Sequence, residues 1–217
     1  MAVDFSRVSV YLVTDPTLSN GRSELEIVRA AASGGIRLIQ YRDKLAGKRL
    51  YLEKARALAE LCRELGVDLL LNDHVDIAAL VDCAGIHLGQ DDLPTAEAKR
   101  LLGPSKIVGR STHDPAQAAA AIREGADYIN IGPVFPTATK NTPVVPVGLD
   151  MVREIARIST VPVTTMGGIR MDNAADVVRA GADRVAVVTA ITKAPDVSRA
   201  ARTLVDLVES AKASRSA

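Results

Sequence analysis

Residues 106–134 read KIVGRSTHDPAQAAAAIREGADYINIGPV, and the pattern of this stretch is typical of one fold class. A short apolar run at 106–112 is followed by an alanine-rich stretch of helical period that ends at Gly125, and a second apolar run covers 127–134. Glycine commonly ends a helix because it adopts the left-handed conformation without strain. The stretch therefore predicts a strand, a helix and a second strand, which is the repeating unit of a parallel sheet.

The same alternation continues in both directions from this stretch. Gly125-Ala126-Asp127 recurs as Gly181-Ala182-Asp183, two strand–helix units further along the chain. The predicted strands are 9–15, 37–43, 68–73, 85–92, 106–112, 127–134, 161–168 and 183–190. The predicted helices are 24–33, 48–65, 75–84, 95–102, 115–125, 149–158, 171–181 and 197–211.

Eight such units predict a single-domain (β/α)8 TIM barrel of the α/β class that spans residues 1–217, with a frayed tail from about residue 210. No linker or low-complexity segment divides the chain. An open doubly wound sheet is the alternative. Against it, the first strand–helix junction lacks a G-x-G-x-x-G fingerprint.

Composition excludes several classes of function. The 27 basic and 26 acidic residues leave a net charge of +1, so nucleic-acid binding is not expected. The N-terminal residues MAVDFSRVSVYLV do not resemble a secretion signal, and no long uncharged apolar window predicts a membrane span. Cys62 and Cys83 lack a partner motif, which indicates a reducing, cytoplasmic compartment. The oligomeric state stays open.

Active sites of such barrels form at the C-terminal ends of the strands. The second strand ends in Gln40, Arg42 and Lys44, whose alternation places all three side chains on one side of the extended backbone. Two neighbouring cations indicate an anionic ligand. The alternative is a solvated loop in which Lys44 pairs with Asp43 at the surface.

Carboxylates follow the next two strands. Asn72-Asp73 closes the third strand and Gln90-Asp91-Asp92 closes the fourth. Adjacent strands lie about 4.8 Å apart, so two such carboxylates can share one Mg²⁺ with phosphate oxygens and water. The alternative is helix capping, because Asp91 or Asp92 could cap the helix at 95–102.

The later strand ends offer groups that suit phosphate. The proline-rich connection 133–148 carries Thr137, Thr139 and Lys140, and its length favours an active-site loop. Gly167-Gly168 and Thr189 end the last two strands, where phosphate sites recur in this fold. The alternative for Gly167-Gly168 is a plain turn. Ser111 indicates a ligand contact rather than a nucleophile. His74, His87 and His113 lack metal-ligand spacing and are interpreted as packing or supporting residues.

Several strings in this order resemble the thiamine phosphate synthase family along nearly the whole chain. They are YLVTD, QYRDK, LLLND, GIHLGQDD, GRSTH and GADYINIGPVFPTATK, followed by GGI, DNA, AGAD and TAI. The resemblance implies a transferase of thiamine biosynthesis with Mg²⁺ as cofactor. Such an enzyme joins a pyrimidine diphosphate to a thiazole phosphate, giving thiamine phosphate and pyrophosphate by a dissociative reaction.

The resemblance also implies roles for individual residues. Arg42, Lys44 and Lys140 are expected to be catalytic, and Asp73 and Asp92 to bind the metal. The pyrimidine diphosphate is expected to contact Gln40, Tyr41, Arg42, Asp43, Lys44, Asn72, Ser111 and Lys140. The thiazole phosphate is expected to contact Thr137, Ala138, Thr139, Gly168, Val188 and Thr189.

The chain departs from the family pattern at Tyr41, at Thr165-Met166 and in TPVVP after Asn141. These positions concern the cavity lining and the loop and leave the predicted phosphate and metal residues unchanged. Three other functions are the alternatives, of which another phosphate-handling isomerase of this fold leaves QYRDK unexplained. A related thiazole tautomerase would need neither the Asp73 and Asp92 pair nor Lys140, and a non-catalytic barrel would bind both precursors without releasing pyrophosphate.

Overall fold

The computed structural model describes residues 3–137 and 145–216 as a closed barrel of parallel strands in the chain order β1 to β8. Strand β8 pairs with β1, which closes the barrel and rules out the open sheet. The strands are β1 (Val10–Val13), β2 (Leu38–Tyr41), β3 (Asp68–Asn72), β4 (Gly85–Leu88), β5 (Ile107–Thr112), β6 (Tyr128–Ile131), β7 (Val163–Met166) and β8 (Arg184–Val187).

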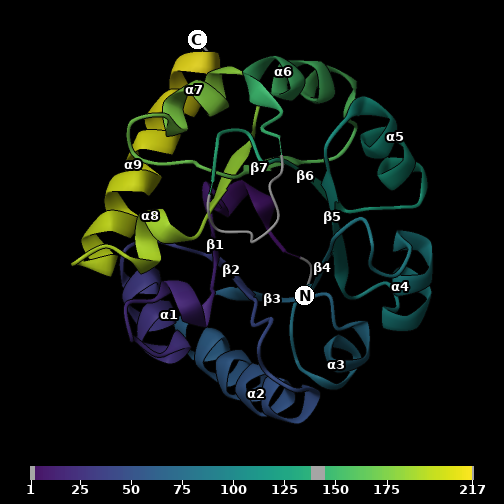
Figure 1. Ribbon diagram of the computed structural model, residues 1–217, viewed down its shortest axis with the longest axis vertical. Helices are drawn as coiled ribbons and strands as arrows, with labels where there is room; N and C mark the ends of the chain where they lie inside the picture. The colour runs from purple at the N-terminus through teal and green to yellow at the C-terminus, as the bar shows by residue number, and fades with distance from the viewer. Residues whose placement is uncertain (1–2, 138–144, 217) are drawn as a thin grey trace.

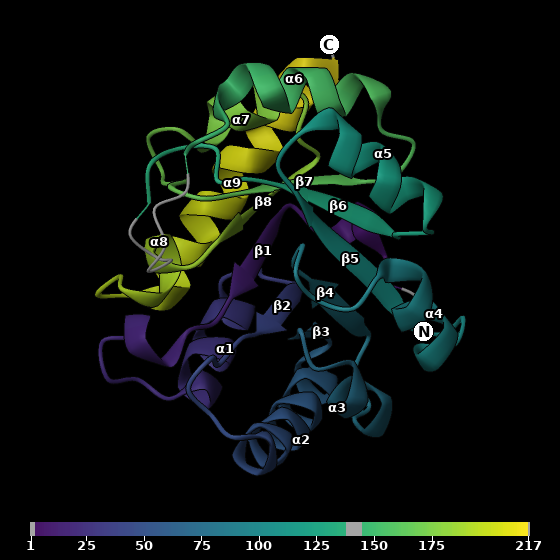
Figure 2. The same ribbon diagram turned by 45° about the vertical axis from the view of Figure 1, so that its right-hand side comes forward.

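Helices surround the barrel as an outer ring, as Figures 1 and 2 show. The outer faces of the strands pack against these helices and form the larger hydrophobic core. Two short 3-10 helices, η1 (Phe5–Arg7) and η2 (Pro16–Leu18), flank β1. The α-helices are α1 (Glu24–Ser33), α2 (Lys48–Leu65), α3 (Val75–Leu80), α4 (Thr95–Leu102), α5 (Pro115–Arg123), α6 (Gly148–Ile158), α7 (Ala174–Arg179), α8 (Thr189–Thr192) and α9 (Val197–Ser216).

The repeated Gly-Ala-Asp triplet has one structural role in both places. Gly125 and Gly181 adopt positive φ values of 87° and 116° just after α5 and α7. The two aspartates that follow each accept a hydrogen bond from the start of the preceding strand. Asp127 accepts from Val108 N at 2.6 Å, and Asp183 accepts from Val163 N at 2.8 Å. The triplet therefore ends a helix and sets the register of the next strand.

The C-terminal segment differs from the prediction of a frayed tail from about residue 210. Helix α9 continues to Ser216 and packs against α1 and α7. Arg215 Nη1 donates to the carbonyls of Val178 at 3.0 Å and Ala182 at 2.9 Å. These contacts with carbonyls around the end of α7 anchor the last turn. None of the helices that the structure describes is long and apolar enough to cross a bilayer.

A smaller core fills the inside of the barrel. Its main side chains include Tyr11 and Tyr128, which are fully buried, together with aliphatic residues from β1, β2, β3, β5 and β8. The phenol of Tyr128 lies across the barrel because Gly109 on β5 has no side chain there. A Cβ at Gly109 would lie 2.0 Å from Cζ of Tyr128. The inner core closes the barrel below the strand ends and forms the floor of the site.

Candidate active site

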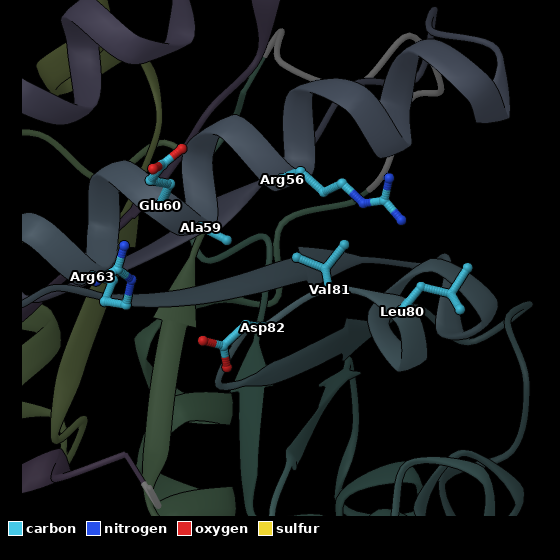
Figure 3. Close-up of a pocket in the computed structure, with 7 residues that line it drawn as sticks. All are labelled: Arg56, Ala59, Glu60, Arg63, Leu80, Val81 and Asp82. Atoms are coloured by element: carbon cyan, nitrogen blue, oxygen red, sulfur yellow. The ribbon is translucent and has the colours of Figure 1, made fainter.

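A cavity of about 620 Å³ opens at the C-terminal ends of the barrel strands. Residues at the end of every strand from β1 to β8 line it, so the topology brings together segments that are far apart in sequence. A second hollow of about 210 Å³ lies on the outer wall between α2 and α3, and Figure 3 shows its side chains, among them Arg56, Arg63 and Leu80. The strand-end cavity is the candidate active site because it collects the predicted polar residues.

The alternation at the end of β2 has the predicted result, because Gln40, Arg42 and Lys44 all line the cavity. Arg42 forms an ion pair with the buried Asp15, which follows β1. Lys44 forms an ion pair with Asp73, which follows β3, rather than with Asp43. Both cations are therefore held at the cavity by carboxylates of the neighbouring strands, and the surface pairing of Lys44 with Asp43 is not observed.

Tyr41 and Asp43 lie on the other side of the same backbone and are not part of the cavity wall that the described residues form. The Tyr41 ring is buried and packs on Tyr51 of α2, with the ring centroids 4.4 Å apart. Asp43 accepts hydrogen bonds from the backbone N–H groups of Leu45 and Ala46, each at 3.0 Å, and pairs with Lys54 at 3.2 Å. The predicted ligand contacts of Tyr41 and Asp43 are therefore replaced by structural roles.

Asp73 and Asp92 come together at one side of the cavity. Asp73 has a φ of 62°, an unusual left-handed conformation for a residue with a side chain. Asp92 accepts a hydrogen bond from Gly89 N at 2.6 Å. Burial raises the pKa of Asp92, and the neighbouring Asp73 carboxyl raises that pKa further. Two close carboxylates favour a bound cation, which would offset their repulsion.

The capping alternative for these carboxylates is not observed. Helix α4 has Pro94 as its N-cap, and no side chain of that cap hydrogen-bonds the first turn. Thr95 N instead donates to Glu124 from another helix end, at 3.0 Å. Asp91 and Asp92 both line the cavity. Both carboxylates therefore belong to the wall of the cavity and do not cap α4.

The donor set fits Mg²⁺ better than a softer metal. Across residues 3–137 and 145–216, no group of three or more His, Cys, Asp or Glu side chains could hold a metal ion. The pair of Asp73 and Asp92 supplies only hard carboxylate oxygens. Mg²⁺ is commonly held by one or two carboxylates, with water and phosphate oxygens completing its octahedron. The residues present fit that ion, provided that a phosphorylated ligand shares it.

The far side of the cavity is formed by the ends of β6, β7 and β8. Thr137, Gly168, Val188 and Thr189 line it, whereas Ala138, Thr139 and Lys140 lie outside the described residues. Gly167 and Gly168 have φ values of 99° and 66°. A Cβ at Gly167 would lie 2.4 Å from Cβ of Pro133, so this turn packs tightly on the loop after β6. The glycines thus have a packing role and also line the cavity.

The floor of the cavity contains polar residues that the sequence did not assign to the site. Asn72 and Ser111 line it, and His87, His113 and Asn130 join them. His87 Nε2 lies 2.9 Å from Ser111 Oγ. Asn130 is 4% exposed, and its Oδ1 has no hydrogen-bond partner among the described residues. A buried, unpartnered acceptor on a cavity wall indicates a contact that a ligand completes.

The remaining histidine has the predicted packing role. His74 contacts the Tyr51 ring edge-on, with the centroids 4.6 Å apart. The missed Asn130 had a possible signal in the sequence, because Asn interrupts the apolar strand YINI two residues after Tyr128. Residues separated by two along a strand share a face, so Tyr128 and Asn130 both point into the barrel.

Comparisons with known proteins agree on one family. The family described as thiamine monophosphate synthase matches residues 10–191. A thiamine-phosphate synthase of Chloroflexus aurantiacus is 48% identical over 199 residues, which cover 92% of each chain. One of Shouchella clausii is 43% identical over 202 residues, covering 93% of this chain and 97% of the relative. The solved thiamine phosphate pyrophosphorylase of Pyrococcus furiosus superimposes with a TM-score of 0.87 at 36% identity, covering 95% of this chain and 98% of that one.

Proposed function

Because the chain belongs to the thiamine monophosphate synthase family, we propose that its strand-end cavity is the site where thiamine phosphate is formed. The chain is a transferase of thiamine biosynthesis, as its curated relatives are. The proposed substrates are 4-amino-2-methyl-5-(diphosphooxymethyl)pyrimidine and 4-methyl-5-(2-phosphooxyethyl)thiazole. The products are thiamine phosphate and pyrophosphate. The observation that carries the proposal is the meeting of Arg42, Lys44, Asp73 and Asp92 on one cavity.

Arg42 and Lys44 are proposed to bind the diphosphate of the pyrimidine substrate, together with Lys140. At the cavity Arg42 pairs with Asp15 and Lys44 with Asp73. These pairs hold the two cations on the wall in advance, so little side-chain ordering remains to be done when an anion binds. Gln40, Asn72 and Ser111 would contact the rest of this substrate from the floor.

Asp73 and Asp92 are proposed to hold Mg²⁺, which would neutralise charge on the diphosphate while it is bound. The pairing of Lys44 with Asp73 has a consequence for this assignment. A cation already sits against one carboxylate, so metal and diphosphate are expected to bind together rather than metal alone. Burial and the Asp73 carboxyl raise the pKa of Asp92, so a nearby positive charge would stabilise its ionised form.

The thiazole phosphate is proposed to bind opposite, between the ends of β6, β7 and β8. Thr137, Ala138, Thr139, Gly168, Val188 and Thr189 form this proposed subsite. Hydroxyl groups and exposed backbone N–H groups suit phosphate oxygens, and glycine permits a close approach of the ligand to the backbone. The two proposed phosphate-binding regions lie across one cavity, and the two heterocycles are proposed to lie between them.

The proposed reaction needs no nucleophile from the protein. The bond between the pyrimidine methylene carbon and the diphosphate oxygen breaks, and its electron pair leaves with pyrophosphate. The lone pair of the thiazole nitrogen then forms the new C–N bond. Arg42, Lys44 and Lys140 stabilise the negative charge that grows on the leaving group. The walls hold the thiazole nitrogen within about 3.5 Å of the carbon and limit access of water.

The test is formation of thiamine phosphate by the purified protein with both precursors and Mg²⁺, detected by fluorescence after oxidation. Release of pyrophosphate in a coupled assay should accompany it at equal amounts. Binding of both precursors without pyrophosphate release would indicate the non-catalytic barrel. Isomerisation of the thiazole alone would indicate the tautomerase.

A pair of matched variants separates the cavity from the rest of the surface. Arg42→Ala should abolish most of the activity, whereas Arg49→Ala on the outer face of α2, where the side chain is 95% exposed, should leave it unchanged. Equal activity of the two variants would contradict the assigned diphosphate site. We also propose a cytoplasmic location, since both cysteines are free and buried, as is usual in a reducing compartment.

A further inference from the structure

A chain of hydrogen bonds runs through the barrel interior and joins two side chains of the cavity floor. Gln40 Nε2 donates to Tyr11 Oη at one end. Tyr11 Oη lies 3.2 Å from Tyr128 Oη, and Tyr128 Oη lies 2.8 Å from His87 Nδ1. His87 Nε2 lies 2.9 Å from Ser111 Oγ at the other end. Both ends line the cavity, and the two tyrosines lie beneath it.

The side chains that form these hydrogen bonds are tightly packed inside the barrel. Tyr11 and Tyr128 are each 0% exposed, and their rings meet edge-on with centroids 6.2 Å apart. The His87 ring stacks on Tyr128 at 5.6 Å. Gly109 leaves the space in which the Tyr128 phenol lies, since a Cβ there would come within 2.4 Å of Tyr128 Oη. The two phenols are therefore fixed in place and cannot turn to other partners.

All hydrogen bonds of this series donate in one direction, from Gln40 towards Ser111. An amide N–H is a donor only, so Tyr11 Oη accepts from Gln40 and directs its own proton to Tyr128. Tyr128 in turn donates to His87 Nδ1, which must then lack a proton, and the proton of the neutral ring is on Nε2. Burial raises the pKa of both phenols, so each keeps its proton at physiological pH. His87 Nε2–H then donates to Ser111 Oγ.

We infer that Tyr11 and Tyr128 are positioning residues that fix the hydrogen-bonding character of the cavity floor at both ends. At one end the Gln40 side-chain N–H donates to Tyr11, which leaves the side-chain carbonyl oxygen of Gln40 to accept a hydrogen bond from a ligand. At the other end Ser111 Oγ accepts from His87, which leaves its hydroxyl proton for a ligand. The floor thus selects an amino-bearing ring beside Gln40 and an anion beside Ser111.

This inference rests on the proposed function, because the pyrimidine diphosphate carries both an amino group and an anion. It explains why the site should bind the amino-substituted pyrimidine more tightly than an oxo-substituted one. An otherwise identical pyrimidine diphosphate with an oxo group in place of the amino group would set its oxygen against the Gln40 carbonyl. Two acceptors that face each other leave both without a donor, which costs on the order of 10-fold or more in affinity.

The first experiment measures dissociation constants of the two pyrimidine diphosphates by calorimetry without the thiazole phosphate. The parent should prefer the amino compound on the order of 10-fold. Tyr11→Phe removes the acceptor that holds the Gln40 amide, so the amide can flip. The preference for the amino compound over the oxo compound should then fall to about twofold or less. Tyr128→Phe interrupts the chain further along and should reduce the preference by a smaller factor. Tyr41→Phe is the matched control, because its buried ring packs on Tyr51 outside the cavity, and it should keep the parent's preference.

A merely structural role of the tyrosines gives a different result. Loosened packing would weaken binding of both compounds by the same factor and leave their ratio unchanged. An unchanged ratio in Tyr11→Phe would therefore overturn the inference. Should the proposed function fail, neither compound would bind to the parent, which is distinguishable from binding without discrimination.

A second measurement is made on the parent protein and does not depend on turnover, and a variant serves only to assign the signal. Nitrogen-15 spectra of labelled histidine report which ring nitrogen carries the proton, and the His87 signal is assigned by its loss in His87→Gln. The series of hydrogen bonds from Gln40 to Ser111 requires a neutral His87 with its proton on Nε2. A proton on Nδ1, or a doubly protonated ring at pH 7.5, would overturn the inference.

Discussion

Gly109→Ala tests how tightly Tyr128 is packed inside the barrel. The added Cβ would lie 2.0 Å from Cζ of Tyr128, where an ordinary contact is 3.4 Å or longer, so the ring would have to move by the difference of about 1.4 Å. Overpacking of this kind costs about 1–3 kcal/mol, and the weakened bond from Tyr128 to His87 adds about 1 kcal/mol. We therefore expect a loss of about 2–4 kcal/mol in the free energy of unfolding.

Thermal and urea unfolding measure this loss directly. For a chain of this size, about 2–4 kcal/mol corresponds to a fall in Tm of about 4–16 °C. Gly47→Ala is the matched control, because nothing lies within 4 Å of a Cβ there, and it should cost about 1 kcal/mol or less as a poorer helix N-cap. A Tyr128→Leu background should remove most of the cost of Gly109→Ala. Equal Tm values for Gly109→Ala and its control would refute the assigned packing of Tyr128.

Three further predictions concern the site and the core. Lys140→Ala should lower kcat on the order of 10²-fold at saturating substrate, because it removes a charge that stabilises the leaving group, and an unchanged kcat would argue against that role. Asp73→Asn should raise the Mg²⁺ concentration needed for half-maximal rate, and a titration that superimposes on the parent's would count against metal binding there. Burial raises the pKa of Cys62 from 9.0 to about 12, so its contribution to stability is complete below pH 9 and is lost as pH rises from 9 towards 12. Urea unfolding at several alkaline pH values should therefore show a smaller loss for Cys62→Ala than for the parent, and identical losses would contradict the shift.

The period of two in β2 decides how much of the site could be predicted from sequence. Alternation correctly places Gln40, Arg42 and Lys44 on the cavity. The same alternation places Tyr41 and Asp43 on the opposite side, so their outward roles with Tyr51 and Lys54 could have been predicted as well. The family resemblance implied that all residues from 40 to 44 contact the diphosphate. In the strand, however, consecutive side chains point to opposite faces, so only every second one reaches the cavity.

The interior hydrogen-bond chain could not be predicted, because it depends on distances across the barrel. Tyr11 and Tyr128 are 117 positions apart, and nothing local indicates that their hydroxyls meet. The one signal was Gly109 in the middle of a strand, since an interior glycine often marks a close approach. The helical end of the chain was missed for a similar reason, because the contacts of Arg215 with Val178 and Ala182 are tertiary.

The most direct test of the proposed site is a crystal structure with the product pyrophosphate and Mn²⁺ in place of Mg²⁺, since the anomalous signal of Mn²⁺ locates the metal. We expect one metal peak between the carboxylates of Asp73 and Asp92, with pyrophosphate oxygens completing its coordination and with Arg42 and Lys44 against the anion. A metal bound elsewhere, or pyrophosphate bound away from Arg42 and Lys44, would contradict it.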